Sequence, residues 1–163
     1  MQSTSLTERI RHYYDAQEWR YQYDEEKNMF GMYMKIDADE LDSCEVRTTV
    51  RKDDYFTTLV NLPLNVPEKK RHLAASYISA VNYGLLLGCF ELDFRDGEIR
   101  YKNTCFCGDT DFDERYIERH ILVGLQMCEL YGPGLIDVLF RGADPAETAK
   151  KLKDKDREDE ESF

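Results

Sequence analysis

The sequence lacks a hydrophobic run as long as a membrane-spanning helix needs, and its polar start, MQSTSLTERIR, lacks the apolar centre of a signal peptide. We therefore expect a cytoplasmic protein that does not contact a membrane. Positive charge is also scarce, because 22 Lys and Arg residues face 33 Asp and Glu residues, which gives a net charge of −11. Nucleic-acid binding needs clustered Lys and Arg, so this balance argues against a nucleic-acid partner. It favours basic partners, or serves only solubility.

Catalytic motifs are missing as well. The chain has no Gly-rich loop after a strand, no nucleophile elbow and no paired catalytic spacing. Its three histidines, His12, His72 and His120, lie far apart among charged neighbours on predicted helices. None of them forms a nucleophile–base pair in the sequence. We predict that the protein is not an enzyme and uses no cofactor, and a catalytic group assembled in space from distant residues stays as an alternative.

Two short patterns begin like metal sites but are incomplete. The segment 109–113, DTDFD, starts like a calcium loop, yet Glu114 and His120 stand where such a loop needs a Gly and a bidentate Glu. Helix capping by these aspartates is the better interpretation. Cys105 and Cys107 place two thiols on one side of a strand end, but no further pair completes four ligands for a soft metal. The odd total of 5 cysteines fits thiols in a reducing compartment.

Hydrophobic periodicity predicts an α+β domain built on an antiparallel sheet of hairpins. A capping box over residues 5–8 starts an N-terminal helix that ends near Ala16. Alternating apolar residues predict one hairpin over 19–36 and a second over 46–62, separated by a loop from Ala38 to Ser43. A third hairpin is expected around the Asp96-Gly97 turn.

The segment 61–101 gives the clearest pattern of the chain, a helix between strands. Asn65 is expected to cap this central helix, Pro67 to lie in its first turn and Gly88 to stop it. One face recurs at helical spacing and is expected to pack against the sheet. Its members are Leu73, Tyr77, Ile78, Val81 and Leu85.

The C-terminal third predicts a long helix and a short one. The long helix is expected to kink or restart at Gly132-Pro133-Gly134, and the short one to start at Asp144-Pro145. From Lys153 onward no apolar periodicity remains. We therefore expect a single domain over residues 1–152 and a charged, disordered tail over residues 153–163.

Several packing and turn positions resemble the bacterial YbjN-like family, which is described as sensory transduction regulators and has the fold of type III secretion chaperones. The carriers are Trp19, Tyr21 and Asp24, Leu62-Pro63, Val66-Pro67-Glu68 with Lys70-Arg71, Asn82, the run from Gly88 to Asp93, Asp96-Gly97-Glu98-Ile99, Pro133, Gly142, and the run from Asp144 to Glu147. Cys105-Phe-Cys107 and the charged tail depart from that family. The resemblance implies a secretion-chaperone-like fold and no catalytic residues.

A protein-interaction module follows as the first functional hypothesis. It would act as a regulator or chaperone-like adaptor that binds another polypeptide, with a homodimer as one possible assembly. Candidate contact residues are Phe30, Met32 and Met34, if they are exposed rather than in the core, and the basic cluster Lys69, Lys70 and Arg71. That cluster could bind a phosphate or an acidic peptide, or could be a solvated first turn of a helix. The alternative hypothesis is a small-molecule or metal sensor that uses the aromatic residues Trp19, Tyr21, Tyr23 and Tyr33.

Overall fold

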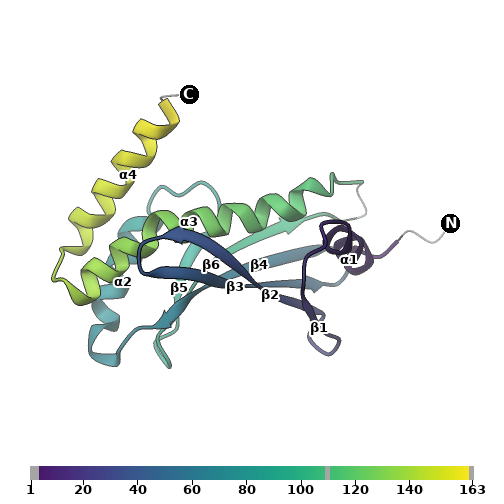
Figure 1. Cartoon of the computed structure of the whole chain (residues 1–163), viewed down its shortest axis with the longest axis horizontal. Helices are drawn as coiled ribbons and strands as arrows, with labels where there is room; N and C mark the ends of the chain where they lie inside the picture. Colours follow the sequence, from purple (N-terminus) through teal and green to yellow (C-terminus); the bar gives the residue numbers. More distant parts are fainter. Residues whose placement is uncertain (1–3, 109–110, 162–163) are drawn as a thin grey trace.

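The described part of the chain folds as one antiparallel six-stranded sheet with its helices on one face (Figure 1). The computed structural model describes residues 4–108 and 111–161. The strand order is β1-β2-β3-β4-β6-β5. In chain order the elements are α1 (Leu6–Ala16), β1 (Gln22–Asp24), β2 (Met29–Ala38), β3 (Leu41–Arg51), β4 (Tyr55–Asn65), the short 3₁₀ helix η1 (Glu68–Lys70), α2 (Arg71–Asn82), β5 (Cys89–Leu92), β6 (Glu98–Phe106), α3 (Arg115–Phe140) and α4 (Pro145–Glu161). The predicted α+β class with an antiparallel sheet is confirmed.

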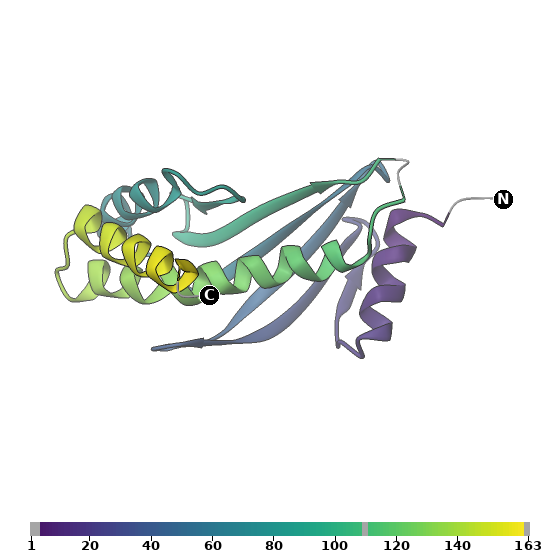
Figure 2. The same ribbon diagram turned by 90° about the horizontal axis from the view of Figure 1, so that it is seen from above.

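Helix α1 forms as its sequence predicts. The Ser5 hydroxyl accepts a hydrogen bond from the Glu8 amide at 3.2 Å, which satisfies one of the unpaired N–H groups of the first turn. Leu6, Ile10 and Tyr14 recur at helical spacing and are buried. The helix therefore lies with this apolar face against one end of the sheet (Figure 2).

Strands β2, β3 and β4 form a continuous meander rather than two separate hairpins. The predicted loop from Ala38 to Ser43 is wrong, because β2 runs to Ala38 and β3 already starts at Leu41. Only Asp39 and Glu40 form the turn, and Glu40 takes a positive φ of 66° there. Leu41 is buried, and its burial stabilises this acidic segment as the start of β3.

The central helix is shorter than predicted at both ends. Asn65 does not cap it, since the side-chain carboxamide of Asn65 donates instead to the Asp96 carbonyl at 3.2 Å. After Pro67 the chain makes the single turn η1, and α2 then ends at Asn82. Tyr77, Ile78 and Val81 are buried as expected, but Leu73 is 43% exposed and Leu85 lies beyond the helix.

Helix α3 is one continuous helix of 26 residues, so it does not restart at Gly132-Pro133-Gly134, and the predicted kink at Pro133, which lies inside the helix, stays a prediction. It lies along the sheet (Figure 1) and has Gly124 where it crosses β4. A Cβ at Gly124 would come 2.5 Å from Val60 Cγ2, which explains the need for glycine. By length and composition α3 could cross a membrane, contrary to the sequence expectation, but half of its apolar window is buried in the protein, as in a core helix.

Helix α4 starts as predicted and then runs much further. The Asp144 carboxylate accepts from the Glu147 amide at 2.9 Å and caps the helix. The helix continues to Glu161, so the structure corrects the predicted lack of order over residues 153–161, while residues 162 and 163 lie outside the described part. The single-domain boundary at residue 152 stays a prediction.

Lys153 of α4 contacts the body of the protein through its ammonium. Its ammonium donates to the carbonyl of Ala80 at 2.7 Å and to that of Tyr83, both at the C-terminal end of α2. Helix C-termini leave carbonyls unpaired and attract cations. Lys153 therefore ties α4 to the end of α2.

We predict that deleting residues 154–163 leaves the melting temperature unchanged within about 2 °C, because the removed residues bury no apolar face. The Lys153→Met variant of the full chain should instead lower it, since the carbonyls of Ala80 and Tyr83 lose their cationic donor. Thermal unfolding followed by circular dichroism measures both. If the truncation costs as much as the Lys153 substitution, the end of α4 must contribute to the fold.

Candidate interaction surface

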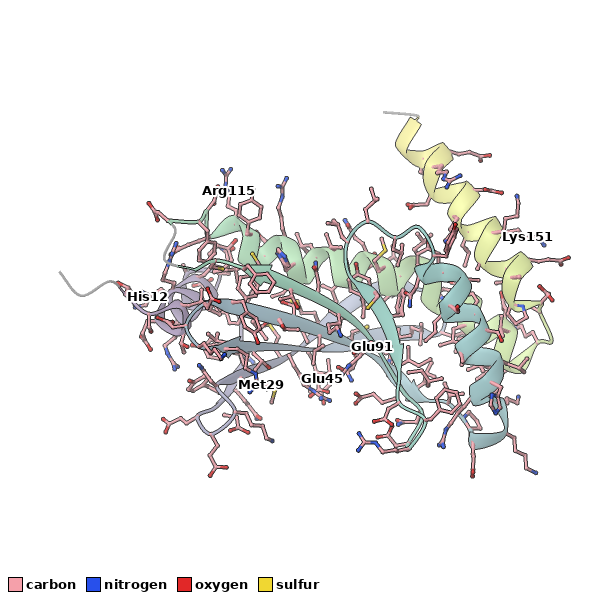
Figure 3. All side chains as sticks on the ribbon, turned by 180° about the vertical axis from the view of Figure 1, so that it is seen from behind. His12, Met29, Glu45, Glu91, Arg115 and Lys151 are labelled. Atoms are coloured by element: carbon pink, nitrogen blue, oxygen red, sulfur yellow. The ribbon has the colours of Figure 1, made fainter. Side chains whose placement is uncertain are left out.

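The sheet face away from the helices carries a ladder of ion pairs. Met29 and Glu45 lie on this side, opposite α3 (Figure 3). Arg47 contacts Glu45 at 2.7 Å and Glu98 at 3.5 Å, and Arg100 contacts Glu91 at 2.8 Å. Lys102 also donates to Glu91.

These charges satisfy one another. Burial alone would raise the pKa of Glu91, but the hydrogen bonds from Lys102 and Arg100 lower it below its ordinary value. Because each charge already has an opposite neighbour, this face offers little net charge to a partner.

The three apolar candidates on β2 belong to the core. Phe30 and Met32 are buried, and Met34 is half-buried against the core. All three point to the face that the helices cover, as the alternation of the strand requires. The possibility that they are core residues is thus confirmed, and Phe30 and Met32 are not available for an exposed contact.

The basic cluster after Pro67 is used inside the fold. Lys70 donates to the Leu139 carbonyl at the end of α3, and its ammonium lies 4.5 Å from the centre of the Phe140 ring. Arg71 donates to the Val66 carbonyl at 3.2 Å and to the Phe94 carbonyl at 2.8 Å. Lys69 alone of the three is exposed. The cluster therefore stabilises a helix end and the third hairpin, and does not form a compact anion site.

The aromatic residues proposed for a sensor pack on one another. The Trp19 ring lies 5.4 Å from Tyr14, and Tyr21 and Tyr23 lie 5.4 Å and 4.7 Å from Phe30. Tyr33 is on the other face of the sheet, 78% exposed. The four aromatics therefore do not converge on one cavity.

The cysteines, histidines and aspartates show no metal site in the described part of the chain, where no group of three suitable ligands occurs. Cys105 and Cys107 bring their sulfurs to 4.0 Å, and burial raises the pKa of the Cys107 thiol to about 12, which keeps it protonated. Asp109 lies outside the described residues. The Asp113 carboxylate accepts from the Arg115 amide at 2.9 Å, but the N-cap of α3 is Glu114, which has no side-chain cap.

The loop over residues 83–88, YGLLLG, forms an apolar surface that the sequence analysis missed. Tyr83, Leu86 and Leu87 are 86%, 97% and 58% exposed. A leucine-rich run normally indicates core, so no sequence signal identified this loop. These residues are exposed because α2 ends at Asn82, before the loop.

The loop is held at both ends, so its apolar side chains have a fixed place. Lys153 binds the Tyr83 carbonyl, and the Tyr101 hydroxyl donates to the Leu87 carbonyl. Gly88 has a φ of +60°, and a Cβ there would come 2.4 Å from the Lys102 carbonyl oxygen. Only glycine allows this close approach.

A groove of about 380 Å³ lies between this loop, α3 and α4. Its walls are apolar or aromatic, from Tyr101, Val123, Met127 and Tyr131. Its rim carries Lys153, Asp156 and Arg157 of α4. We call the loop and this groove together the 83–88 surface.

A larger hollow of about 790 Å³ lies between α2 and the edge strand β5. The edge is covered at Phe90, because the Asn82 carboxamide donates to the Phe90 carbonyl at 2.9 Å and accepts from the Phe90 amide at 2.8 Å. The Arg71 guanidinium likewise donates a hydrogen bond to the Phe94 carbonyl. At these two positions side chains replace a neighbouring strand, which hinders strand addition there.

Comparison with known proteins gives a distant fold likeness. No protein-family model matches the chain, and no curated protein sequence matches it. A chain of the solved structure entitled "Structure of the HopA1-SchA Chaperone-Effector Complex" is similar over 72% of this chain and 84% of its own length, with 14% sequence identity and a TM-score of 0.42. At that distance the likeness carries no argument about function.

Proposed function

We propose that the chain is a non-catalytic protein-interaction module of the cytosol, a regulator or chaperone-like adaptor that binds another polypeptide. The observation that carries the proposal is the 83–88 surface, where Leu86 is almost fully exposed beside an apolar groove. Contiguous exposed apolar groups rimmed by charges are typical of protein-binding sites. The resemblance to the YbjN-like regulators is consistent with this role.

A polypeptide fits the 83–88 surface better than a small ligand does. The exposed side chains of Tyr83 and Leu86 project from the loop, whereas a small molecule is held by concave walls. An apolar side chain of a partner could enter the groove beside Met127 and Tyr131, while the rim of α4 offers both signs of charge. The second candidate, a small-molecule sensor, is favoured only by the groove volume of about 380 Å³, which lies in the range of ligand sites.

The test compares partner capture by matched variants. Leu86→Ser combined with Leu87→Ser should reduce the polypeptides retained from the native cytosol at least tenfold, because the apolar anchors are removed. Leu122→Ser is the control, since Leu122 is also exposed but lies on α3 outside the groove. Both variants should keep the melting temperature of the parent chain.

Equal capture by the two variants would contradict the proposal. A specific small molecule that copurifies with the parent chain in native mass spectrometry, and is lost with the double variant, would favour the sensor.

A further inference from the structure

The second edge of the sheet, along β2, is open beyond the short strand β1. Strand β1 pairs only with residues Met29, Phe30 and Gly31 of β2. The rest of β2, up to Ala38, has no strand outside it among the described residues. In Figure 2 this part of the strand runs out past α1 and β1 toward the β2–β3 turn.

The pairing pattern identifies which backbone groups point outward. The Val50 amide donates to the Asn28 carbonyl at 3.0 Å, so even-numbered residues of β2 turn their N–H and C=O groups toward β3. Odd-numbered residues therefore turn theirs to the outside. The Asp37 amide agrees with this assignment, because it donates outward to the Glu129 carboxylate at 2.9 Å.

In the described part of the chain, Tyr33 and Lys35 are the two residues of this stretch whose outward N–H and C=O groups both lack a bonding partner, whereas Asp37 has its N–H bonded. Gly31 on one side is paired with Gln22, and Asp37 on the other is bonded to Glu129. The open window thus contains two N–H groups and two C=O groups. A row of this kind is a template for another strand.

We propose that this window binds a second copy of the chain, through antiparallel pairing of β2 with β2 about a two-fold axis at Met34. With that axis, Tyr33 lies opposite Lys35 of the second copy, and Lys35 opposite its Tyr33. Opposed residues of this type exchange both N–H···O=C bonds, so four bonds use every open group of both copies. Pairing by this axis is isologous and closed, which limits it to a dimer.

The side chains also fit a second copy. On the open sheet face the Lys35 ammonium would lie by the exposed Tyr33 ring of the other copy, in reach of a cation–π contact. On the helix face, Met34 would pack against its symmetry mate. Lys35 is the only charge between Gly31 and Ile36, so the window avoids the repulsion that a net charge of −11 causes between copies elsewhere.

The space around the window allows the approach. A hollow of about 480 Å³, lined by residues including Arg20, Gln22 and Tyr33, lies at the β1 end. At the other end, the register of β2 shifts between Lys35 and Ala38, and an irregularity of this kind bends a strand. The strand of a second copy can therefore leave the sheet after Lys35 without displacing Gln22.

The first test uses proline, which removes an outward N–H and is tolerated where an edge strand faces solvent. Lys35→Pro should raise the dimer dissociation constant at least tenfold in analytical ultracentrifugation. Lys35→Thr keeps the backbone N–H and should remain dimeric. Both should melt like the parent chain, because the Lys35 N–H has no partner within one copy.

The second test remains decisive if Lys35→Pro fails to fold. Met34→Cys places two thiols opposite each other at the axis, where the Cα atoms of such a pair lie about 4.5 Å apart. Diamide, which accepts two electrons and two protons, should join them, and mass spectrometry should find the 34–34 disulfide between copies. Absence of this disulfide, a monomer at millimolar parent chain, or equal dimerisation of the Pro and Thr variants would overturn the proposal.

This inference does not depend on the 83–88 surface. The Leu86→Ser, Leu87→Ser variant should dimerise as the parent does. If that variant becomes monomeric while Lys35→Pro stays dimeric, the copies associate through the 83–88 surface and the β2 proposal fails.

Discussion

Replacing Ile78 with Asp is expected to unfold the protein or to leave it barely stable at room temperature. Ile78 is buried on α2, where it borders Phe90, Ile99 and Leu135. Phe90, Ile99 and Leu135 offer a carboxylate no cation and no hydrogen-bond donor, so the new charge gains hydration or a cation only by turning toward the hollow beside β5 that Ile78 also lines. An uncompensated buried charge costs about 3–5 kcal/mol, which is a large part of the roughly 5–15 kcal/mol that stabilises a domain.

The matched control is Leu73→Asp on the same helix. Leu73 is 43% exposed, so a carboxylate there stays hydrated and should change the free energy of unfolding by less than about 1 kcal/mol. Urea denaturation of the two variants separates the sites. A Leu73→Asp variant as unstable as Ile78→Asp would mean that α2 packs through the face predicted from the sequence rather than the observed one.

This difference between Leu73 and Ile78 shows what apolar periodicity can and cannot predict. The repeat of apolar residues predicted the helix and most of its buried face correctly, because helical spacing fixes which side chains lie together. It did not fix where the helix ends. Asn82 turns its carboxamide to the Phe90 backbone, and Lys153, far along the chain, caps the end of α2.

For the same reason the candidate site could not be predicted from the sequence. The leucines of the loop read as a continuation of the helix, and their exposure depends on contacts with Tyr101 and α4. For the basic cluster the sequence misleads in the opposite way, because residues that look exposed are bonded within the fold. In the sequence Lys70 and Arg71 look like free surface charges. In the structure Lys70 donates a hydrogen bond to the C-terminal end of α3, and Arg71 donates one to the Phe94 carbonyl.

The sheet edges needed the strand order as well. The sequence predicted antiparallel hairpins, which local alternation and turns specify. The insertion of β6 between β4 and β5 makes β5 an edge, and the short β1 leaves half of β2 open. Neither of these two edges can be predicted from the alternation of Tyr33, Met34 and Lys35.

Replacing Gly97 with Ala is expected to destabilise the third hairpin strongly. Gly97 has a φ of +82°, and an added Cβ would come 2.2 Å from the Val66 carbonyl oxygen. The left-handed backbone alone costs a residue with a side chain about 1–2 kcal/mol. The close atom belongs to the backbone, and Val66 is fixed because its amide donates to the Gly97 carbonyl at 2.8 Å. Relief of the clash must therefore break that bond, which brings the expected loss to about 2–4 kcal/mol.

Asp96→Ala is the control for this turn, because it changes the neighbouring residue without adding a clash. It removes the hydrogen bond from the Glu98 amide to the Asp96 carboxylate, 2.9 Å long and exposed, and should cost at most about 1 kcal/mol. For a chain of this size, about 2–4 kcal/mol corresponds to a fall in melting temperature of roughly 5–15 °C, against a few degrees for the control. Similar melting temperatures for the two variants would show that the hairpin can move away from Val66, and that the tight contact at Gly97 does not hold the third hairpin to the start of the central helix.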